Sequence, residues 1–175
     1  FLERLMHITL TEAGLDDAEA IHKLQVEAFL PLLEKYQDVD TNPAKESIDD
    51  IVRRLEQPTT TYYFIMLDED RIGAIRVVRR EEGRARISPV FVIPEFQGRG
   101  FGQQVMRLVE GLHDVQTWEL NTIQQETGNC YLYEKMGYVK IGDAKVINDR
   151  MTIISYVKIV AGQIHDRQDK ERDSD

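Results

Sequence analysis

The stretch Pro94-Glu95-Phe96-Gln97-Gly98-Arg99-Gly100-Phe101-Gly102 lies where an expected strand gives way to an expected helix. Its three glycines alternate with other residues. A glycine has no Cβ, so the backbone N–H groups beside it can approach a ligand closely. The first turn of the helix adds unpaired N–H donors and a positive partial charge. The stretch therefore predicts an anion site, most naturally for phosphate or diphosphate, to which Arg99 could add a charged contact.

Two familiar phosphate motifs do not fit this stretch. It lacks the Gly-Lys-Ser/Thr ending of a P-loop. It also differs from the dinucleotide fingerprint, because its glycines are spaced i, i+2, i+4 and no early strand precedes it. On the residues alone, a flexible turn whose glycines serve only its shape stays open.

The segments that flank the glycines alternate like strands or repeat like helices. Before them, strands are expected over 62–67, 72–78 and 84–93, and after them a helix to Leu112 and a strand over 116–121. The strand before the helix and the strand after it make a βαβ unit, whose two strands are normally parallel. Pro89 predicts a bulge or an unpaired edge in the first of these strands, since proline cannot donate to a ladder.

The remaining elements are read from the same periods. We expect a strand over 8–11 and a helix from Asp16. Pro31 should bend this helix, end it, or start a second one. Further along the chain we expect a helix capped by Ser47, a short helix over 129–136, and a hairpin of 138–147 with 151–160. In the helix after the glycines, the predicted buried stripe is Phe101, Val105, Leu108 and Leu112.

Length and charge limit the classes of protein to which the chain could belong. Its 175 residues fit one domain. With a formal net charge of −9, the chain lacks the broad basic surface that non-specific nucleic-acid binding requires. The same charge argues against an anionic membrane surface as a partner. A local basic site for a small anion stays open. We expect residues 1–6 to be an added or disordered lead, 7–160 a single domain, and the polar residues 161–175 a disordered tail.

Cysteine and histidine usage bears on metals and on the compartment. The single Cys130 excludes an internal disulfide and a cysteine-rich zinc site, and the four histidines show no ligand spacing, so no metal is expected. This usage suits a reducing compartment and predicts a cytoplasmic location. No apolar run approaches the roughly 18 residues of a membrane helix.

With these elements in place, the sequence resembles the GNAT superfamily of N-acyltransferases. The family signature Gln/Arg-x-x-Gly-x-Gly/Ala is matched by residues 97–102, and Leu132-Tyr133-Glu134-Lys135-Met136-Gly137-Tyr138 is similar to a second family segment. The element order fits over residues 7–160. The resemblance implies a mixed α/β fold, in which a mostly antiparallel, twisted sheet is splayed in the middle and carries helices on both faces.

The resemblance also implies acetyl-CoA as co-substrate. In the family the pyrophosphate sits on amides of the glycine loop, and the pantetheine arm pairs with the preceding strand. The residues implied in cofactor binding are Val90, Phe91, Val92, Gln97, Gly98, Arg99, Gly100, Phe101, Gly102, Gln103 and Asn129. A strand disrupted at Pro89 agrees with this, because it offers backbone groups to an extended ligand.

Tyr133 matches the family tyrosine that can protonate the CoA sulfur. A phenol with a pKa near 10 can donate at neutral pH. Asn129 lies four residues earlier, on the same helix face. The alternative for Tyr133 is an aromatic ring that packs beside Leu132 and Met136. The sequence thus offers one catalytic candidate, Tyr133.

Two positions depart from the family pattern. Glu126 stands where many members carry an asparagine that contacts pantetheine, and Asn121 stands where some carry a glutamate base. Glu119 shares the face of Asn121 and could be a base or a solvated side chain. A water relay, or an amine that arrives partly deprotonated, also stays open. Cys130 has no histidine nearby in sequence to activate it as a nucleophile.

The sequence indicates the acceptor only weakly. Five acids could attract a cationic amine or form a solvated face: Asp38, Asp40, Glu46, Asp49 and Asp50. Tyr36 and Phe29 could line the acceptor pocket. The chain could also form a homodimer through the last hairpin or a sheet edge.

The sequence therefore predicts direct acetyl transfer from acetyl-CoA to a primary amine of a small molecule or peptide, without metal. One alternative is a non-catalytic module that binds or senses acyl-CoA. Another is a structural or interaction protein whose glycines serve only the turn. Polyamines, aminoglycosides, amino acids, protein N-termini and xenobiotic amines all stay open as acceptors.

Overall fold

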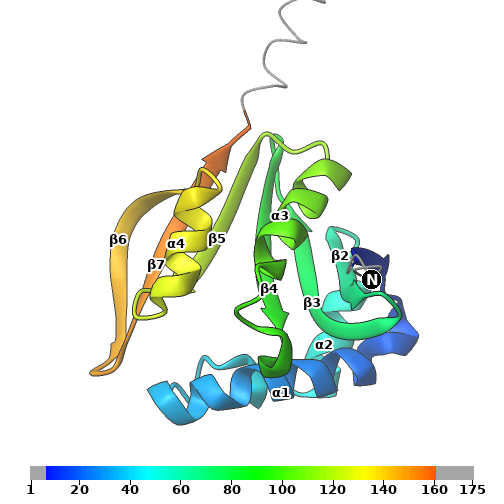
Figure 1. Ribbon diagram of the computed structural model, residues 1–175, viewed down its shortest axis with the longest axis horizontal. Helices are drawn as coiled ribbons and strands as arrows, with labels where there is room; N and C mark the ends of the chain where they lie inside the picture. The colour runs from blue at the N-terminus through cyan, green and yellow to red at the C-terminus, as the bar shows by residue number, and fades with distance from the viewer. Residues whose placement is uncertain (1–6, 161–175) are drawn as a thin grey trace, which may run out of the picture.

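In the computed structural model, which describes residues 7–160, seven strands form one open sheet in the order β1-β2-β3-β4-β5-β7-β6 (Figure 1). The strands are β1 Ile8–Glu12, β2 Thr60–Leu67, β3 Asp70–Arg79, β4 Arg84–Val92, β5 Thr117–Ile123, β6 Val139–Asn148 and β7 Met151–Ile159. Neighbouring strands are antiparallel except β4 and β5, which are parallel. This confirms the predicted mixed α/β fold and its βαβ unit.

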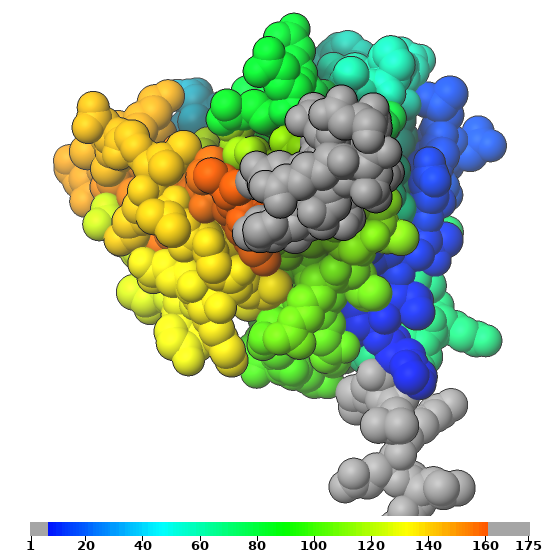
Figure 2. Space-filling view, turned by 90° about the horizontal axis from the view of Figure 1, so that it is seen from above, coloured from blue at the N-terminus to red at the C-terminus, as the bar shows by residue number. Residues whose placement is uncertain are grey.

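Four α-helices cover the two faces of the sheet. They are α1 Ala18–Tyr36, α2 Ile48–Glu56, α3 Phe101–Leu112 and α4 Thr127–Lys135. On one face, Ile21 of α1 and Ile51 of α2 pack with Phe64 of β2, and on the other Val105 of α3 packs in the cluster of Trp118. Seen from above, α3 and α4 lie along one side of the molecule and α2 along the opposite side (Figure 2).

The sheet opens between β4 and β5. Their ladder has three residue pairs, from Arg84 with Thr117 to Arg86 with Glu119. Beyond these pairs the two strands diverge (Figure 1). On the other side of β4, the register jumps from Val77 opposite Ile87 to Ile75 opposite Val90, so residues 88–89 form a bulge. The bulge confirms the prediction from Pro89, and a bulge bends its strand.

Helix α1 differs from the prediction at Pro31. Of the alternatives expected at Pro31, an end of the helix and the start of a second one are wrong, because α1 runs through Pro31 to Tyr36. The last turn is held from outside, because the Tyr36 hydroxyl donates to Glu126 Oε2 at 2.8 Å and Asn148 Nδ2 donates to the Tyr36 carbonyl at 2.9 Å. Such tertiary contacts offset the roughly 3 kcal/mol that an interior proline costs a helix.

The predicted buried stripe of α3 is wrong in its second half. Leu108 and Leu112 are 38% and 58% exposed, whereas Met106 and Val109 are buried. The buried face is centred near Gly102 and Val109 instead of Leu108. A Cβ on Gly102 would lie 2.8 Å from Leu132 Cδ2 of α4, so the missing side chain lets α4 approach there. Because α4 packs against α3 at Gly102, the buried face of α3 is rotated away from Leu108 and toward α4.

Within residues 7–160, no helix is long and apolar enough to cross a membrane. The expected lead, 1–6, and the expected tail, 161–175, lie outside the described residues. The boundaries of the 7–160 domain stay a prediction.

A substitution at Gly73 tests how closely β3 and β4 approach each other. A Cβ there would lie 2.0 Å from the Phe91 carbonyl oxygen, a backbone atom that cannot move aside alone. We expect Gly73→Ala to lower the free energy of unfolding by about 1–3 kcal/mol, as overpacking does. Urea unfolding measures this change.

Gly111→Ala is the matched control, because a Cβ at Gly111 meets nothing within 4 Å. Gly111 lies in α3, where alanine is up to about 1 kcal/mol more favourable than glycine. A Gly73→Ala protein as stable as the wild type would contradict the close approach of the two strands.

Candidate active site

A cleft of about 490 Å³ lies beside the far half of β4. Its walls come from β4, the glycine loop, the first turns of α3, α4 and one side of α1. Of the predicted site residues, it is lined by Val90, Phe91, Val92, Gln97, Gly98, Gly100, Phe101, Gly102, Gln103, Asn129 and Tyr133. The structure thus brings together residues that lie 43 positions apart in the sequence, from Val90 to Tyr133.

Arg99 is the one predicted site residue that does not line the cleft. Its guanidinium lies 5.4 Å from the centre of the Phe96 ring, in a cation–π contact. The side chain is therefore directed to Phe96. Only the backbone amide of Arg99 keeps the expected role.

The glycine loop has free amides because of its backbone shape. Gly98 and Gly100 have φ values of +73° and +79°, the left-handed region that costs an ordinary residue about 1–2 kcal/mol. Within the described part of the chain, the N–H groups of residues 98–100 have no acceptor. Gly100 caps α3 without a side chain, so the first-turn amides of α3 are free as well. This row of donors can hold a diphosphate.

Gln97 ties this loop to the end of β4. Its side-chain Nε2 donates to the Val92 carbonyl at 2.8 Å. The bond fixes the distance between the donors of the loop and the strand that leads into it. Gln97 therefore positions the loop through its side chain.

The peptide groups of the three predicted β4 residues, Val90, Phe91 and Val92, do not all face the same side of the strand. The Ile93 amide donates to Ile72 of β3 at 2.8 Å. Because hydrogen-bonded pairs alternate in an antiparallel ladder, the peptide groups of Phe91 also face β3, while those of Val90 and Val92 face the gap toward β5. The expectation that an extended ligand pairs with the Phe91 backbone is therefore corrected. The Phe91 ring instead meets Phe29 of α1, 5.4 Å away between ring centres.

Tyr133 both packs and reaches the cleft. Its ring centre lies 5.8 Å from that of Tyr138 and 6.0 Å from that of Tyr156, and the residue is 6% exposed. Burial raises the pKa of Tyr133 to about 12. The phenol therefore stays protonated across the physiological range and is a standing hydrogen-bond donor. Asn129 lines the same cleft from the preceding turn of α4.

Glu126 is the site residue that sequence reasoning missed. It lines the cleft at the start of α4, and its Oε2 accepts from the Tyr36 hydroxyl at 2.8 Å and from Lys35 Nζ at 2.9 Å. Burial, together with the bond to Glu126, raises the pKa of Tyr36. The contacts join the end of α1 to α4 across one end of the cleft. The available signal was the glutamate at a family asparagine position, which gave no hint of its partners.

Glu119, the base candidate that the sequence offered, is held by arginines outside the cleft. Glu119 pairs with Arg84, and with Arg80 at 3.9 Å. Asn121 lies 2.9 Å from Ser155 Oγ. Cys130 Sγ contacts the Ile123 and Gln124 carbonyls at 3.8 Å. None of these three residues lines the cleft.

Most of the five predicted acids serve their own segment. Asp38 is buried and accepts from Asn42 Nδ2 at 3.2 Å, and Asp50 accepts from the Ser47 amide at 2.8 Å in a capping box. Glu46 pairs with Arg54. Asp40 and Asp49 are exposed. Of the two alternatives for these acids, a cation-attracting cluster is thus not what the structure favours, since three of the five stabilise local structure. Phe29 lines the cleft as expected, whereas Tyr36 lies behind Glu126.

Comparisons with known proteins agree with this geometry. The family model described as an acetyltransferase (GNAT) domain matches residues 58–140. An acetyltransferase from Thermus thermophilus superposes with a TM-score of 0.68 at 18% identity, over 89% of this chain and 99% of the other. Spermidine N-acetyltransferase from Vibrio cholerae, in complex with CoA and spermine, gives a TM-score of 0.69 at 18% identity, over 87% and 95%.

An aminoglycoside acetyltransferase in complex with coenzyme A gives a TM-score of 0.66 at 17% identity, over 92% of this chain and 98% of the other. At these identities the likeness establishes a shared fold. No significant match is found among curated protein sequences.

The loop geometry generates a binding prediction. Gly100→Val places a β-branched residue at a φ of +79°, so the loop must change shape and its amides must turn away. We expect the Kd for coenzyme A to rise at least about tenfold, which is about 1.4 kcal/mol. Isothermal titration calorimetry measures it.

Gly142→Val is the control, because it also places a β-branched residue at a positive φ but lies away from the glycine loop. Gly142 has a φ of +65°, lies in β6 and has nothing within 4 Å of its Cβ position. Its Kd for coenzyme A should equal that of the wild type. If both variants bind coenzyme A equally well, the glycine loop is not the binding element.

Proposed function

We propose that the chain, whose residues 58–140 match the GNAT acetyltransferase domain model, moves an acetyl group from acetyl-CoA to a primary amine of a small molecule or peptide. The observation that carries the proposal is the row of amides at residues 98–100, free of protein acceptors and placed beside a cleft that runs to Tyr133. This arrangement suits a ligand that has a diphosphate at the loop amides and a thioester near Tyr133.

The residues present fit the co-substrate along its length. The loop amides and the first turn of α3 bind the diphosphate. The backbones of Val90 and Val92 pair with the pantetheine arm, as an added strand would. An N–H of β4 that faces the gap, from Val92 or Val90, donates to the thioester oxygen when negative charge develops there. Asn129 contacts the arm from α4.

The reaction itself is a direct attack. The neutral amine nitrogen bonds to the thioester carbon, the carbon–sulfur bond breaks, and the sulfur gains a proton. Tyr133 donates to this sulfur, since its raised pKa keeps the phenol protonated. The proton that the attacking ammonium must lose passes to water or is already absent when the amine arrives.

Glu126 supports the amine end of the cleft. One carboxylate oxygen, Oε2, is held by Lys35 and Tyr36. The other oxygen accepts from an N–H group of pantetheine or of the incoming amine, a role that the usual asparagine fills as well. Because Lys35 already pairs with it, Glu126 orients rather than neutralises the amine. A cytoplasmic location and a homodimer belong to the same proposal, the latter through the edge strand β6.

A screen of amines tests the activity directly. Wild-type protein, acetyl-CoA and a panel of polyamines, aminoglycosides, amino acids and simple alkylamines are combined, and the released CoA thiol is measured. Turnover with at least one amine is expected. Calorimetry with coenzyme A runs in parallel: binding without any turnover would turn the assignment toward an acyl-CoA sensor, and no binding at millimolar ligand would remove the co-substrate.

Tyr133→Phe tests the proton donor. It removes the hydroxyl but keeps the ring that packs against Tyr138 and Tyr156. We expect kcat to fall about 100-fold or more, as when a general acid is lost, with the Kd for coenzyme A within about threefold. Tyr131→Phe is the control in the same helix, since Tyr131 is 69% exposed. Equal kcat in both variants would take Tyr133 out of the mechanism.

The pH profile gives a second test of the same residue. A pKa raised to about 12 means that the donor form persists below pH 11, and that the group loses its proton only above that. The wild-type rate should therefore rise with pH as the amine deprotonates near 10. A decline centred near pH 9 that Tyr133→Phe abolishes would contradict the raised pKa.

A further inference from the structure

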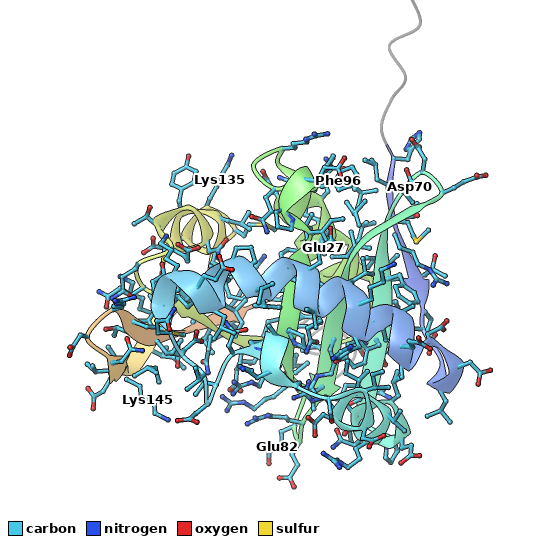
Figure 3. The ribbon with its side chains drawn as sticks, turned by 90° about the horizontal axis from the view of Figure 1, so that it is seen from below. Glu27, Asp70, Glu82, Phe96, Lys135 and Lys145 are labelled. Atoms are coloured by element: carbon cyan, nitrogen blue, oxygen red, sulfur yellow. The ribbon has the colours of Figure 1, made fainter. Side chains whose placement is uncertain are left out.

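The α1 face of the sheet carries polar side chains beside the point where β4 and β5 part. Ala74 of β3 packs with Ala28 of α1, so Arg76, two residues on, shares that face. Arg86 of β4 alternates with Ala85 and Ile87, which lie in the core of the opposite face. Figure 3 looks onto this side, where nitrogen-tipped side chains gather near the labelled Glu82.

The carboxylates of this face are already paired. Glu119 lies between Arg84 and Arg80, and Glu46 pairs with Arg54. Within residues 7–160, no carboxylate oxygen comes within 4.0 Å of the guanidinium of Arg76 or Arg86. Neither of these two partly buried cations therefore forms an ion pair within the described residues, although the whole chain has a net charge of −9.

Neutral groups hold both guanidinium groups in place. Arg76 Nε donates to the Ser88 carbonyl in the bulge of β4. With its amide turned to accept, the Asn121 oxygen lies 2.9 Å from Arg86 Nη2, and its nitrogen donates to Ser155 Oγ at 2.9 Å. Carbonyl and amide oxygens orient a guanidinium without cancelling its charge.

The charge of Arg76 is unfavourable where it stands. Burial is the largest cause that lowers the pKa of Arg76, and it outweighs Tyr62 and Glu46, which raise the pKa, while the cations Arg54 and Arg86 lower it further. An anion bound between these groups would reverse that cost, because opposite charges close together favour the charged forms. Arginine also matches carboxylate and phosphate with paired donors.

The position of the two arginines relates them to the reaction. Arg86 pairs with Glu119 in the last residue pair before the gap, and Arg76 stands opposite the bulge at residues 88–89. Val90, whose backbone faces the gap, follows Arg86 by four residues, about 13 Å along a strand. Both arginines therefore stand beside the end of the gap that is nearest to the β4–β5 ladder.

We propose that Arg76 and Arg86 bind a carboxylate or phosphate of the amine acceptor, so that the acceptor carries both an amine and an anionic group. The inference rests on the proposed function and names its substrate class. Spermidine and aminoglycosides, the substrates named for two structural neighbours, are polycations. Two unpaired arginines repel such molecules and thereby select against them.

The test follows the guanidinium resonances by NMR in wild-type protein labelled with ¹⁵N-arginine, with and without coenzyme A. The probes are two matched pairs: O-phosphoethanolamine against ethanolamine, and 4-aminobutyrate against butylamine. The spectrum of Arg86→Gln assigns the Arg86 signal by its loss. We expect the Arg76 and Arg86 signals to shift with the anionic member of each pair only.

Affinity and turnover complete the test. Arg86→Gln should weaken binding of the better anionic probe at least about tenfold, about 1.4 kcal/mol. Arg53→Gln should not, because Arg53 is an exposed residue of α2 that pairs with Asp50. Wild-type kcat/KM for the anionic acceptor should exceed that for its matched amine and for spermidine by the same factor.

The outcomes separate the two proposals. Signals that shift equally with both members of a pair, an unchanged affinity in Arg86→Gln, or a preference for spermidine would each overturn the anion site. The NMR readout does not depend on catalysis. If the arginine signals respond as expected but no amine is acetylated, the anion site stands and acetyl transfer fails.

Discussion

The ladder between β4 and β5 stops after three residue pairs, and the candidate site depends on this interruption. The bulge at residues 88–89 bends β4 away, and proline at position 89 has no N–H with which to rejoin a ladder. The backbones of Val90 and Val92 are left facing a gap instead of a neighbouring strand. The Val92 carbonyl accepts from Gln97 Nε2, and the peptide groups that still face the gap favour an extended ligand with its own amides.

The same interruption sets what lies on each side of the sheet. On the α3 face, the glycine loop places free amides at one end of the cleft and Tyr133 stands at the other. On the α1 face, Arg76 and Arg86 border the point of divergence. The cleft is lined by α1 as well as by α3 and α4, so beside the gap it reaches both faces of the sheet.

Periodicity and turn residues were enough to predict the elements of the fold and the bulge at Pro89. Two helices show where local rules are not sufficient. Pro31 stays inside α1 because contacts of Tyr36 with α4 and β6 hold the following turn, and these partners lie 90 and 112 residues away. The buried face of α3 differs from the predicted one because Gly102, which has no side chain, lets Leu132 of α4 pack against the helix there. Neither contact can be read from a helical period.

The site was predicted in part, for a similar reason. Motif spacing indicated the glycine loop and Tyr133, which do line one cleft. It could not show that the Arg99 side chain turns to Phe96, that the Phe91 peptides face β3, or that Glu126 holds Tyr36. Each depends on which way a group points, and alternation fixes that only once the strand register is known.

The proposed function depends on binding of the diphosphate of the co-substrate by the amides of residues 98–103. An amide ¹H–¹⁵N NMR titration tests it most directly, with coenzyme A compared against pantetheine, which lacks the diphosphate. The account predicts that the amide signals of residues 98–103 shift strongly with coenzyme A and hardly with pantetheine, while those of Val90 and Val92 respond to both. Signals of the loop that stay in place at saturating coenzyme A would contradict it.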